Sequence, residues 1–177
     1  STLASIAFPA WHLGRNPGHE FISCSYSGSL AMSFSRKVRQ VLREPSYKKI
    51  FEETRLDKDS QSVESWQTTH GGGYVAAGVG GGITGKGAHI LLIDDPVKNR
   101  EDAESENSRE ATWDWYTSTA YTRLAPGGGI LVILTRWHDD DLAGRLLMAS
   151  EDGADDWEVV KYPAIAEEDE KFRAVGE

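Results

Sequence analysis

The sequence predicts an α/β protein with a mainly parallel central sheet flanked by helices. Two continuous apolar runs, residues 88–95 and 130–134, have the composition of buried strands, and a shorter strand is expected at 21–26. Segments with helical periodicity lie between these strands. Strands that alternate with helices are typical of parallel sheets with right-handed crossovers, so the pattern favours a single layered domain.

The remaining elements follow from periodicity and from turn residues. Apolar residues at helical spacing predict a helix over 1–13, interrupted by Pro9. Gly28 and Ser29 supply a turn and an N-cap for an amphipathic helix that ends near Glu44. Nine of the 18 glycines lie between Gly71 and Gly87, which indicates tight turns and close backbone approaches. Further along the chain the expected elements are a hairpin-like region over 63–79, helices over 100–123 and from 139–141 to about 149, and a last strand over 157–162.

Composition limits the class of protein. A chain of 177 residues is long enough for one domain with a core, and its single cysteine, Cys24, excludes an internal disulfide. No apolar run approaches the roughly 20 residues of a membrane helix, so we expect a soluble intracellular protein without membrane contact. The net charge of −9 means that any nucleic-acid contact requires a local basic patch. Between Glu151 and Glu170 nine acids accompany the single Lys161, which predicts a solvated acidic tail.

The most informative feature is the end of the apolar run 88–95. This run terminates in Asp94 and Asp95, and Pro96 follows. Ligands of open parallel sheets bind beyond the carboxyl ends of the strands, and two adjacent carboxylates need a nearby cation, usually that of a magnesium nucleotide. In a Walker B interpretation Asp94 holds the Mg²⁺ shell and Asp95 activates the water that attacks the terminal phosphate. The alternative is that these residues only form a turn that ends the strand.

A phosphate-binding loop is harder to locate. Gly80 to Gly87 resembles G-x-x-x-x-G-K-[ST] but lacks the final hydroxyl and leads into a strand rather than a helix, so we reject it. The chain starts with Ser1 and has no initiator methionine, which suggests a fragment. If Gly-Lys preceded Ser1, the start would satisfy the motif and Ser1 would supply the hydroxyl that binds Mg²⁺; alternatively Ser1 is an ordinary terminal serine.

The strand 130–134 delivers a second group of polar residues to the same edge. Thr135 directly follows it and should lie near Asp94 and Asp95, where its hydroxyl would distinguish ATP from ADP. Arg136 is a second candidate contact for phosphate, although an arginine there is more often a surface ion-pair partner. His138 is expected to be structural.

A basic stripe lies on the helix that ends near Glu44. Arg36, Arg39 and Arg43 share one face and are candidate contacts for DNA phosphates. A basic helix face is more often simply solvated.

Taken in order, these motifs resemble the ATPase domain of the large terminase subunit of tailed bacteriophages, the motor that packages DNA. The matching segments cover nearly all of residues 1–162. They are Phe8-Pro9-Ala10-Trp11 with Leu13-Gly14, Ser25-Tyr26-Ser27 with the Arg36–Arg39 helix, Gly80 to Gly87 leading into Ile93-Asp94-Asp95-Pro96-Val97-Lys98, and Leu134-Thr135-Arg136-Trp137-His138 with Asp141-Leu142.

The resemblance implies a RecA-like P-loop NTPase domain of the ASCE type that uses ATP and Mg²⁺. It places Asp94 as the Walker B acid, Asp95 as the catalytic acid, Thr135 in the motif that couples hydrolysis to movement, and Ser1 as the last residue of Walker A. Relatives often carry an arginine near Walker B that reaches a neighbour's nucleotide, and the basic residue in that stretch here is Lys86.

The resemblance also implies partners and a location. The partners are double-stranded DNA, the portal protein, the small terminase subunit and further copies of the chain in a ring on the portal. The location is the host bacterial cytoplasm, with transient attachment to the procapsid.

The resemblance sets the expected domain limits. We expect an ATPase domain over 1–162, truncated at Walker A, and an acidic linker over 163–177 toward an absent nuclease domain. Without the Gly-Lys of Walker A, this piece is expected to bind and hydrolyse ATP poorly. The rival interpretations are another RecA-like ATPase, such as a helicase, and a non-catalytic remnant.

Overall fold

A six-stranded sheet forms the centre of the protein. The computed structural model describes residues 1–83, 85, 87–161, 165–167, 169 and 172–176, which fall into two units, Ser1–Arg145 and Leu146–Glu177. The strand order is β2-β3-β4-β1-β5-β6, and the neighbours β4, β1, β5 and β6 pair in parallel. The strands are β1 (Glu20–Ser25), β2 (Leu56–Gln61), β3 (Ser65–Thr68), β4 (Gly73–Gly78), β5 (Ala88–Asp94) and β6 (Leu124–Ile133). The predicted α/β class with a mainly parallel sheet is confirmed.

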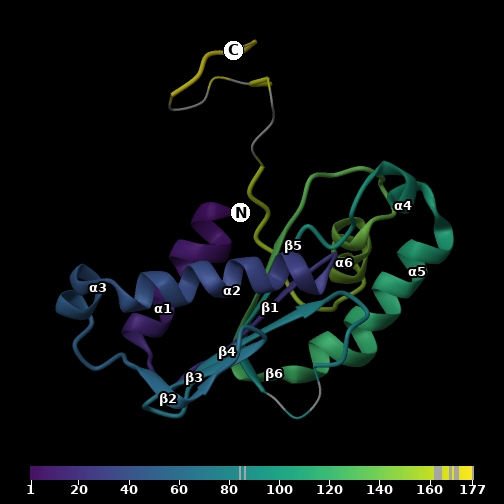
Figure 1. The fold of residues 1–177 in the computed structure, drawn as a ribbon. Helices are drawn as coiled ribbons and strands as arrows, with labels where there is room; N and C mark the ends of the chain where they lie inside the picture. The colour runs from purple at the N-terminus through teal and green to yellow at the C-terminus, as the bar shows by residue number, and fades with distance from the viewer. Residues whose placement is uncertain (84, 86, 162–164, 168, 170–171, 177) are drawn as a thin grey trace. The chain divides into compact units, whose positions relative to one another are not determined.

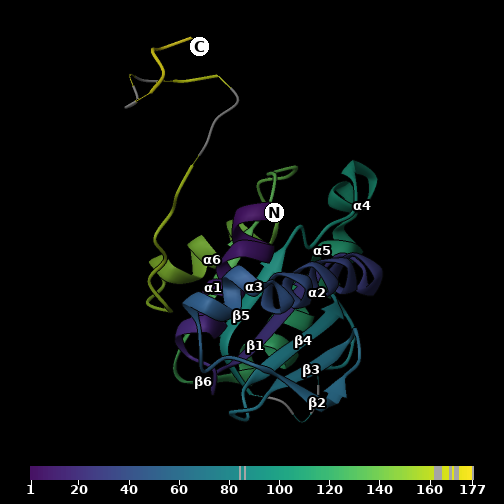
Figure 2. The same cartoon turned by 60° about the vertical axis from the view of Figure 1, so that its left-hand side comes forward.

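Helices cover both faces of the sheet. Those that precede β2 in sequence lie on one face, and α4 and α5 lie on the other (Figures 1 and 2). The helical elements are η1 (Thr2–Ala7), α1 (Phe8–Arg15), α2 (Gly28–Arg43), α3 (Pro45–Ile50), α4 (Arg100–Glu104), α5 (Glu106–Trp115), η2 (Tyr116–Ala120), η3 (Tyr121–Arg123) and α6 (Leu142–Glu151).

The N-terminal helical segment runs through Pro9 instead of being interrupted there. The first turn, η1, is a π-helix, and Pro9 stands in the first turn of α1. Proline is tolerated at that point because the N–H groups that open a helix have no partner within it. The segment carries the chain from Ser1 down to β1.

Helix α2 covers the centre of the sheet. Its buried residues include Ala31, Phe34, Val38 and Leu42, at the spacing of one helix face, and it packs on β4 and β1. Its N-cap is Ser27, whose hydroxyl accepts a hydrogen bond from the Leu30 N–H at 3.3 Å. The predicted cap, Ser29, is therefore wrong by two residues, because the helix begins at Gly28.

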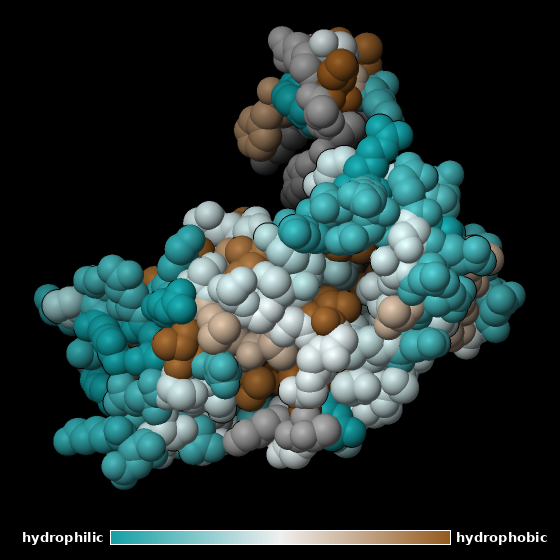
Figure 3. Space-filling view, turned by 45° about the vertical axis from the view of Figure 1, so that its right-hand side comes forward, coloured by the Kyte–Doolittle hydropathy of each residue, from teal (hydrophilic) through white to brown (hydrophobic). Residues whose placement is uncertain are grey.

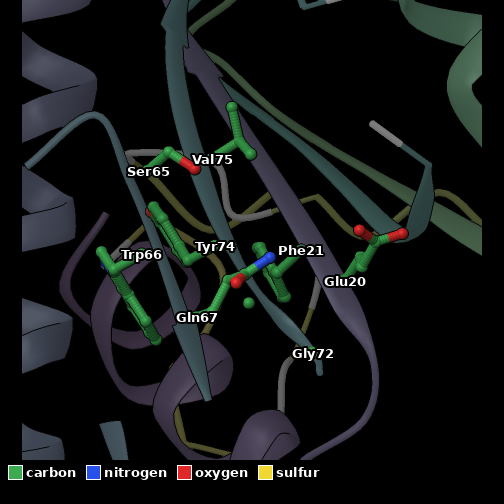
Figure 4. A pocket seen from close by; sticks show the side chains of 9 residues that line it. Glu20, Phe21, Ser65, Trp66, Gln67, Gly72, Tyr74 and Val75 are labelled. Atoms are coloured by element: carbon green, nitrogen blue, oxygen red, sulfur yellow. The ribbon is translucent and has the colours of Figure 1, made fainter. Parts of the chain in front are cut away.

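Three aromatic rings cross the sheet between strands β3, β4 and β1. The rings of Trp66 and Tyr74 are nearly parallel and stack with centroids 5.3 Å apart, and those of Tyr74 and Phe21 stack at 5.5 Å (Figure 4). All three side chains are buried. A small pocket beside them is lined by residues at the amino ends of β1 and β4. It therefore lies at the opposite end of the parallel strands from Asp94 and Asp95.

The glycine-rich region makes the close approaches that its composition predicts. A Cβ on Gly73 would lie 2.5 Å from the carbonyl oxygen of Trp66, and one on Gly78 would lie 2.8 Å from the amide nitrogen of Gly28. Strands β3 and β4 form the predicted hairpin.

Several sequence predictions need correction at the edges of the sheet. Strand β2 was not predicted because its sequence, Leu-Asp-Lys-Asp-Ser-Gln, lacks apolar alternation, as an edge strand permits. Strand β6 begins at Leu124 rather than Ile130; it is the other edge strand, where Pro126 costs no ladder hydrogen bond. The helix predicted over 100–123 is broken at Ser105, which caps α5.

The last predicted strand does not form. Residues 157–161 are irregular, and most of their side chains are exposed, so burial does not stabilise a strand there; Tyr162 lies outside the described residues. The unit Leu146–Glu177 contains the second half of α6 followed by irregular chain, in which the Gly176 N–H donates to the Ala166 carbonyl at 2.9 Å. The linker over 163–177 stays a prediction.

The surface shown in Figure 3 mixes polar and apolar side chains, with apolar atoms in small separate groups. Among the helices that the structure describes, none is long and apolar enough to cross a membrane. The single Cys24 is buried, and burial raises its thiol pKa to about 12, so the side chain is unreactive at neutral pH.

Three histidines meet at the end of the sheet where β1 and β5 begin. His12 Nε2 lies 3.1 Å from His19 Nδ1, and the rings of His19 and His89 stack with centroids 4.2 Å apart. His89 Nδ1 also accepts the Glu20 N–H at 3.0 Å. Burial lowers the pKa of His12 and His19, and the charge of neighbouring histidines lowers both further. The packing therefore favours neutral rings at His12 and His19.

We predict that this cluster makes the fold less stable in mild acid. In the unfolded chain His12 and His19 bind protons near the ordinary histidine pKa of 6.5, whereas in the folded protein their pKa is lower. The free energy of unfolding is therefore highest above pH 6.5 and declines as the pH falls below it. Urea unfolding between about pH 5.5 and 7.5 measures this loss.

His12→Gln retains a hydrogen-bonding amide near the position of Nε2 and is expected to reduce the loss of stability in mild acid. The control His70→Gln, at an exposed histidine, should leave that loss unchanged. An equal pH dependence in wild type and His12→Gln would contradict the prediction.

Candidate functional site

Two carboxylates lie at the carboxyl end of β5, because Asp94 is the last residue of this strand and Asp95 follows it. The neighbouring strands are β1 and β6. The carbonyl of Asp95 accepts the Tyr26 N–H at 2.9 Å, and its N–H donates to the Ile133 carbonyl at 2.8 Å. Asp95 has a φ of 50°, in the left-handed region that aspartate and asparagine tolerate better than most residues. Hydrogen bonds to the ends of β1 and β6 thus hold Asp95 in a backbone conformation that turns the chain sharply after the strand.

Asp94 is buried, with 1 % of its surface exposed, and two serines hydrogen-bond its carboxylate. The Ser1 hydroxyl donates to Oδ1 at 3.3 Å, and the fully buried Ser5 hydroxyl donates to Oδ2. Both serines belong to the first turn of the chain, where the Ser5 N–H donates to the Ser1 carbonyl at 2.6 Å. Hydroxyl donors on both oxygens offset the cost of burying a carboxylate.

Asp95 is more accessible and sits in a different environment. Burial raises the pKa of its carboxyl, and the charge of Asp94 raises it further, while a hydrogen bond from the Thr135 N–H acts in the opposite direction. A carboxylate with a raised pKa is a better proton acceptor than an ordinary surface aspartate. The two adjacent acids therefore differ in exposure and in hydrogen bonding.

A pocket opens beside Asp95 between the chain that follows β5, the chain that follows β6, and α4. Thr135 is exposed there at the end of β6. The lining residues are Asp95, Pro96, Val97, Ala103, Leu134, Thr135, Trp137 and Asp141. The structure thus brings Ser1, Asp94, Asp95 and Thr135 to one edge of the sheet, as the sequence predicts.

Arg136 is engaged with the protein rather than free. Its Nε donates to Asp141 Oδ2 at 2.6 Å, and its guanidinium also reaches the Asp139 carbonyl at 3.0 Å. Asp141 Oδ1 accepts the Gly144 N–H at 2.9 Å and so caps α6, as predicted. A Cβ on Gly144 would lie 1.8 Å from the Asp139 carbonyl oxygen, so the first turn of α6 requires glycine at this position. The role of Arg136 toward phosphate stays a prediction.

A charged network that no sequence pattern indicates connects α5 to the same loop. Asp140 accepts hydrogen bonds from Arg109 at 2.9 Å and from Arg145 at 2.7 and 2.8 Å, and Arg145 also donates to Glu110 at 2.9 Å. The hydrogen bonds from Arg145 and Arg109 hold the pKa of the Asp140 carboxyl well below its usual range. The partners lie up to 35 residues apart in sequence. No local pattern signals such a network, so only the fold reveals it.

The predicted basic stripe of α2 is partly used within the fold. Arg39 donates to the carbonyls of Gln61 and Ser62 at 2.8 and 3.1 Å, and Arg43 donates to the Gln61 side chain at 2.7 Å. Arg36 is exposed. These contacts fasten α2 to the turn after β2, and the DNA-binding role stays a prediction.

The rejected phosphate loop has no helix after it. Gly80 has a φ of 78° in a turn, the Trp115 indole N–H donates to the Gly81 carbonyl at 3.3 Å, and the chain then enters β5. Lys86, the predicted nucleotide contact in this stretch, lies outside the described residues.

The donors at this edge fit Mg²⁺ with a nucleotide. The hydroxyl of Ser1 and the carboxylate of Asp94 are hard oxygen donors, which Mg²⁺ prefers. Within the described part of the chain no three His, Cys, Asp or Glu side chains form a cluster suited to a metal. When phosphate oxygens also bind Mg²⁺, the protein typically supplies only one or two carboxylate ligands.

Comparison with known proteins agrees with this arrangement. The sequence matches the family described as "Terminase large subunit, T4likevirus-type, N-terminal" over residues 1–177. The chain belongs to this terminase family. Membership confirms the predicted resemblance and favours a terminase over the helicase-like alternative. No curated protein matches the chain.

Among solved structures, the large terminase of bacteriophage HK97 is similar to this terminase chain, with a TM-score of 0.46 and 15 % sequence identity. The alignment covers 77 % of this chain and 26 % of the HK97 protein, so the chain spans about a quarter of that protein's length.

The backbone of Asp95 supports a prediction about stability. Asp95→Asn should fold nearly as stably as wild type because asparagine tolerates positive φ, whereas Asp95→Ala should be less stable than Asp95→Asn by about 1 kcal/mol. Urea unfolding at neutral pH measures the difference.

Asp114 on α5 provides the matched control. Alanine is the better helix former, so the order should invert there, with Asp114→Ala more stable than Asp114→Asn. The same order at both positions would contradict a left-handed Asp95.

Proposed function

We propose that this chain is the ATP-hydrolysing motor domain of a terminase large subunit and that its parent protein couples hydrolysis to translocation of double-stranded DNA into procapsids. The observation that carries the proposal is the convergence of Ser1, Asp94, Asp95 and Thr135 at the carboxyl edge of a parallel sheet. Open α/β sheets bind ligands at this edge. The family match adds that the fold belongs to a terminase.

Each group has a distinct role in the proposal. Ser1 and Asp94 would hold Mg²⁺, which would supply positive charge to the phosphates of a bound nucleotide. Asp95, which is more exposed and has a raised pKa, orients the attacking water and accepts its proton. Two neighbouring acids thus divide the tasks of holding the cation and activating water.

Thr135 is proposed to connect the nucleotide to movement. Its backbone N–H donates to the Asp95 carboxylate, and its exposed side chain lies in the pocket beside that acid. A change in the hydrogen bonding of Asp95 on hydrolysis therefore reaches the loop after β6 directly. That loop leads through Arg136 and Asp141 into α6.

The wider assembly belongs to the same proposal. The partners are double-stranded DNA, the portal protein, the small terminase subunit and copies of the chain in a ring, in the host cytoplasm and transiently on the procapsid. Arg36, Arg39 and Arg43 remain candidate DNA contacts, and Lys86 and Arg136 candidate nucleotide contacts. A Gly-Lys before Ser1 would complete Walker A; its absence from the parent protein would favour the non-catalytic alternative.

The catalytic role of Asp95 predicts a separation of turnover from binding. In the parent protein with a complete Walker A, Asp95→Asn should lower ATP turnover at least about 100-fold, because the proton acceptor is lost. ATP affinity should stay within a few-fold of wild type, since Ser1 and Asp94 remain. Phosphate release measures turnover, and a fluorescent ATP analogue measures affinity.

Asp114→Asn changes a carboxylate on the exposed surface of α5 and serves as the control, with wild-type values expected for both quantities. Near-normal turnover in Asp95→Asn would remove Asp95 from its role.

The coupling role of Thr135 predicts a different defect. Thr135→Val preserves the backbone N–H that reaches Asp95 but removes the hydroxyl, so DNA-independent ATP turnover should fall no more than a few-fold while packaging of DNA into procapsids is lost. Thr135→Ser should restore packaging. Full packaging activity in Thr135→Val would show that the hydroxyl is not needed.

A further inference from the structure

We propose that Ser5 is a positioning residue that fixes the carboxylate of Asp94 and leaves only one of its oxygens, Oδ1, available to a metal or its water shell. The inference rests on the proposed function and assigns a role to a residue that no sequence motif identifies. Ser5 touches neither the nucleotide nor the reacting atoms in this scheme. It acts through Asp94.

The hydrogen bond of Ser5 is directed at the site rather than at its own helix. Ser5 has no exposed surface, and its hydroxyl donates to Asp94 Oδ2 across 89 residues of sequence. Serine in a helical segment often bonds a carbonyl of the preceding turn instead, as Ser33 does with the Leu30 carbonyl. The side chain of Ser5 therefore connects the first turn of the chain to the end of β5.

This bond divides the two oxygens of Asp94 between two environments. Oδ2 accepts a hydrogen bond from the buried Ser5, whereas Oδ1 accepts one from Ser1, the proposed ligand of Mg²⁺. Rotation about the last bond of an aspartate is broad, so an unrestrained carboxylate samples many orientations. A donor fixed on Oδ2 selects one orientation and directs Oδ1 toward the proposed metal position.

Mg²⁺ makes such restraint useful. It requires near-octahedral geometry and is typically held by one or two carboxylates together with phosphate oxygens. Residues that orient a metal ligand commonly change metal affinity by about 10- to 100-fold when they are removed. Loss of the Ser5 hydroxyl is expected to lower the affinity for Mg²⁺ by a factor in this range.

The test compares Ser5→Ala with Ser35→Ala in the parent protein that contains this domain. Ser35 is an equally buried serine that donates to the Val63 carbonyl at 2.7 Å and accepts from the Trp66 indole at 3.0 Å, away from the site. For each variant, Mn²⁺ binding in the presence of ADP is measured by electron paramagnetic resonance, the Mg²⁺ concentration for half-maximal ATP turnover is determined, and urea unfolding gives stability.

We expect both variants to lose stability and only Ser5→Ala to lose metal affinity, by about 10- to 100-fold, with turnover recovering at saturating Mg²⁺. Ser5→Thr, which retains the hydroxyl, should recover metal affinity. If Ser5→Ala does not fold, Ser5→Cys, with a weaker donor of similar size, should give a smaller shift in the same direction. Wild-type metal affinity in folded Ser5→Ala or Ser5→Cys would overturn the proposal, as would an equal shift in Ser35→Ala.

The Asp94→Asn variant distinguishes failure of the role proposed for Ser5 from failure of the proposed function. If wild type and Asp94→Asn bind Mn²⁺ with ADP equally well, the nucleotide site itself is wrong and the role of Ser5 is overturned with it. If Asp94→Asn loses the metal and Ser5→Ala does not, only the role of Ser5 is wrong.

Discussion

The buried carboxylate of Asp94 is the feature on which the site depends. A charged group with 1 % exposure is costly unless donors surround it, and here hydroxyls from the first turn of the chain bind both oxygens. This interaction fixes the start of η1 against the end of β5, so the N-terminal segment and the sheet form one site. The same hydroxyls and carboxylate are hard oxygen donors of the kind that Mg²⁺ prefers. Stability and the proposed chemistry therefore depend on the same few atoms.

Asp95 shows how the sheet places a second acid that is only partly buried. Its peptide group bonds the ends of both neighbouring strands, and its positive φ turns the chain away from β5 immediately afterwards. The carboxylate consequently lies at the pocket beside Thr135 rather than in the core. Beyond that pocket, Arg136 and Asp141 continue the hydrogen bonding into α6, while Asp140 joins the same loop to α5. A change at Asp95 is thus connected to helices α5 and α6 through a short series of covalent and hydrogen bonds.

The sequence was sufficient for the parts of this architecture that depend on apolar periodicity. The strand of residues 88–95, the amphipathic helix α2 and the meeting of Asp94, Asp95 and Thr135 all follow from buried strands with polar ends. It was insufficient where burial and neighbours decide the structure: the polar strand β2 forms because β3 offers an edge, and residues 157–161 stay irregular because most of their side chains are exposed. Ser5 was missed for a related reason, since a serine inside a helical turn carries no signal until the fold brings Asp94 to it. The Asp140 network likewise joins residues with no shared motif.

A crystal structure of the parent protein with Mn²⁺ and a non-hydrolysable ATP analogue tests the central claim most directly. Anomalous scattering would locate the metal independently of the rest of the density. The account predicts Mn²⁺ bound to Asp94 Oδ1, directly or through one water, beside Ser1, with the terminal phosphate facing Asp95. A nucleotide and metal bound elsewhere, with Asp94 still enclosed by its two serines, would contradict it.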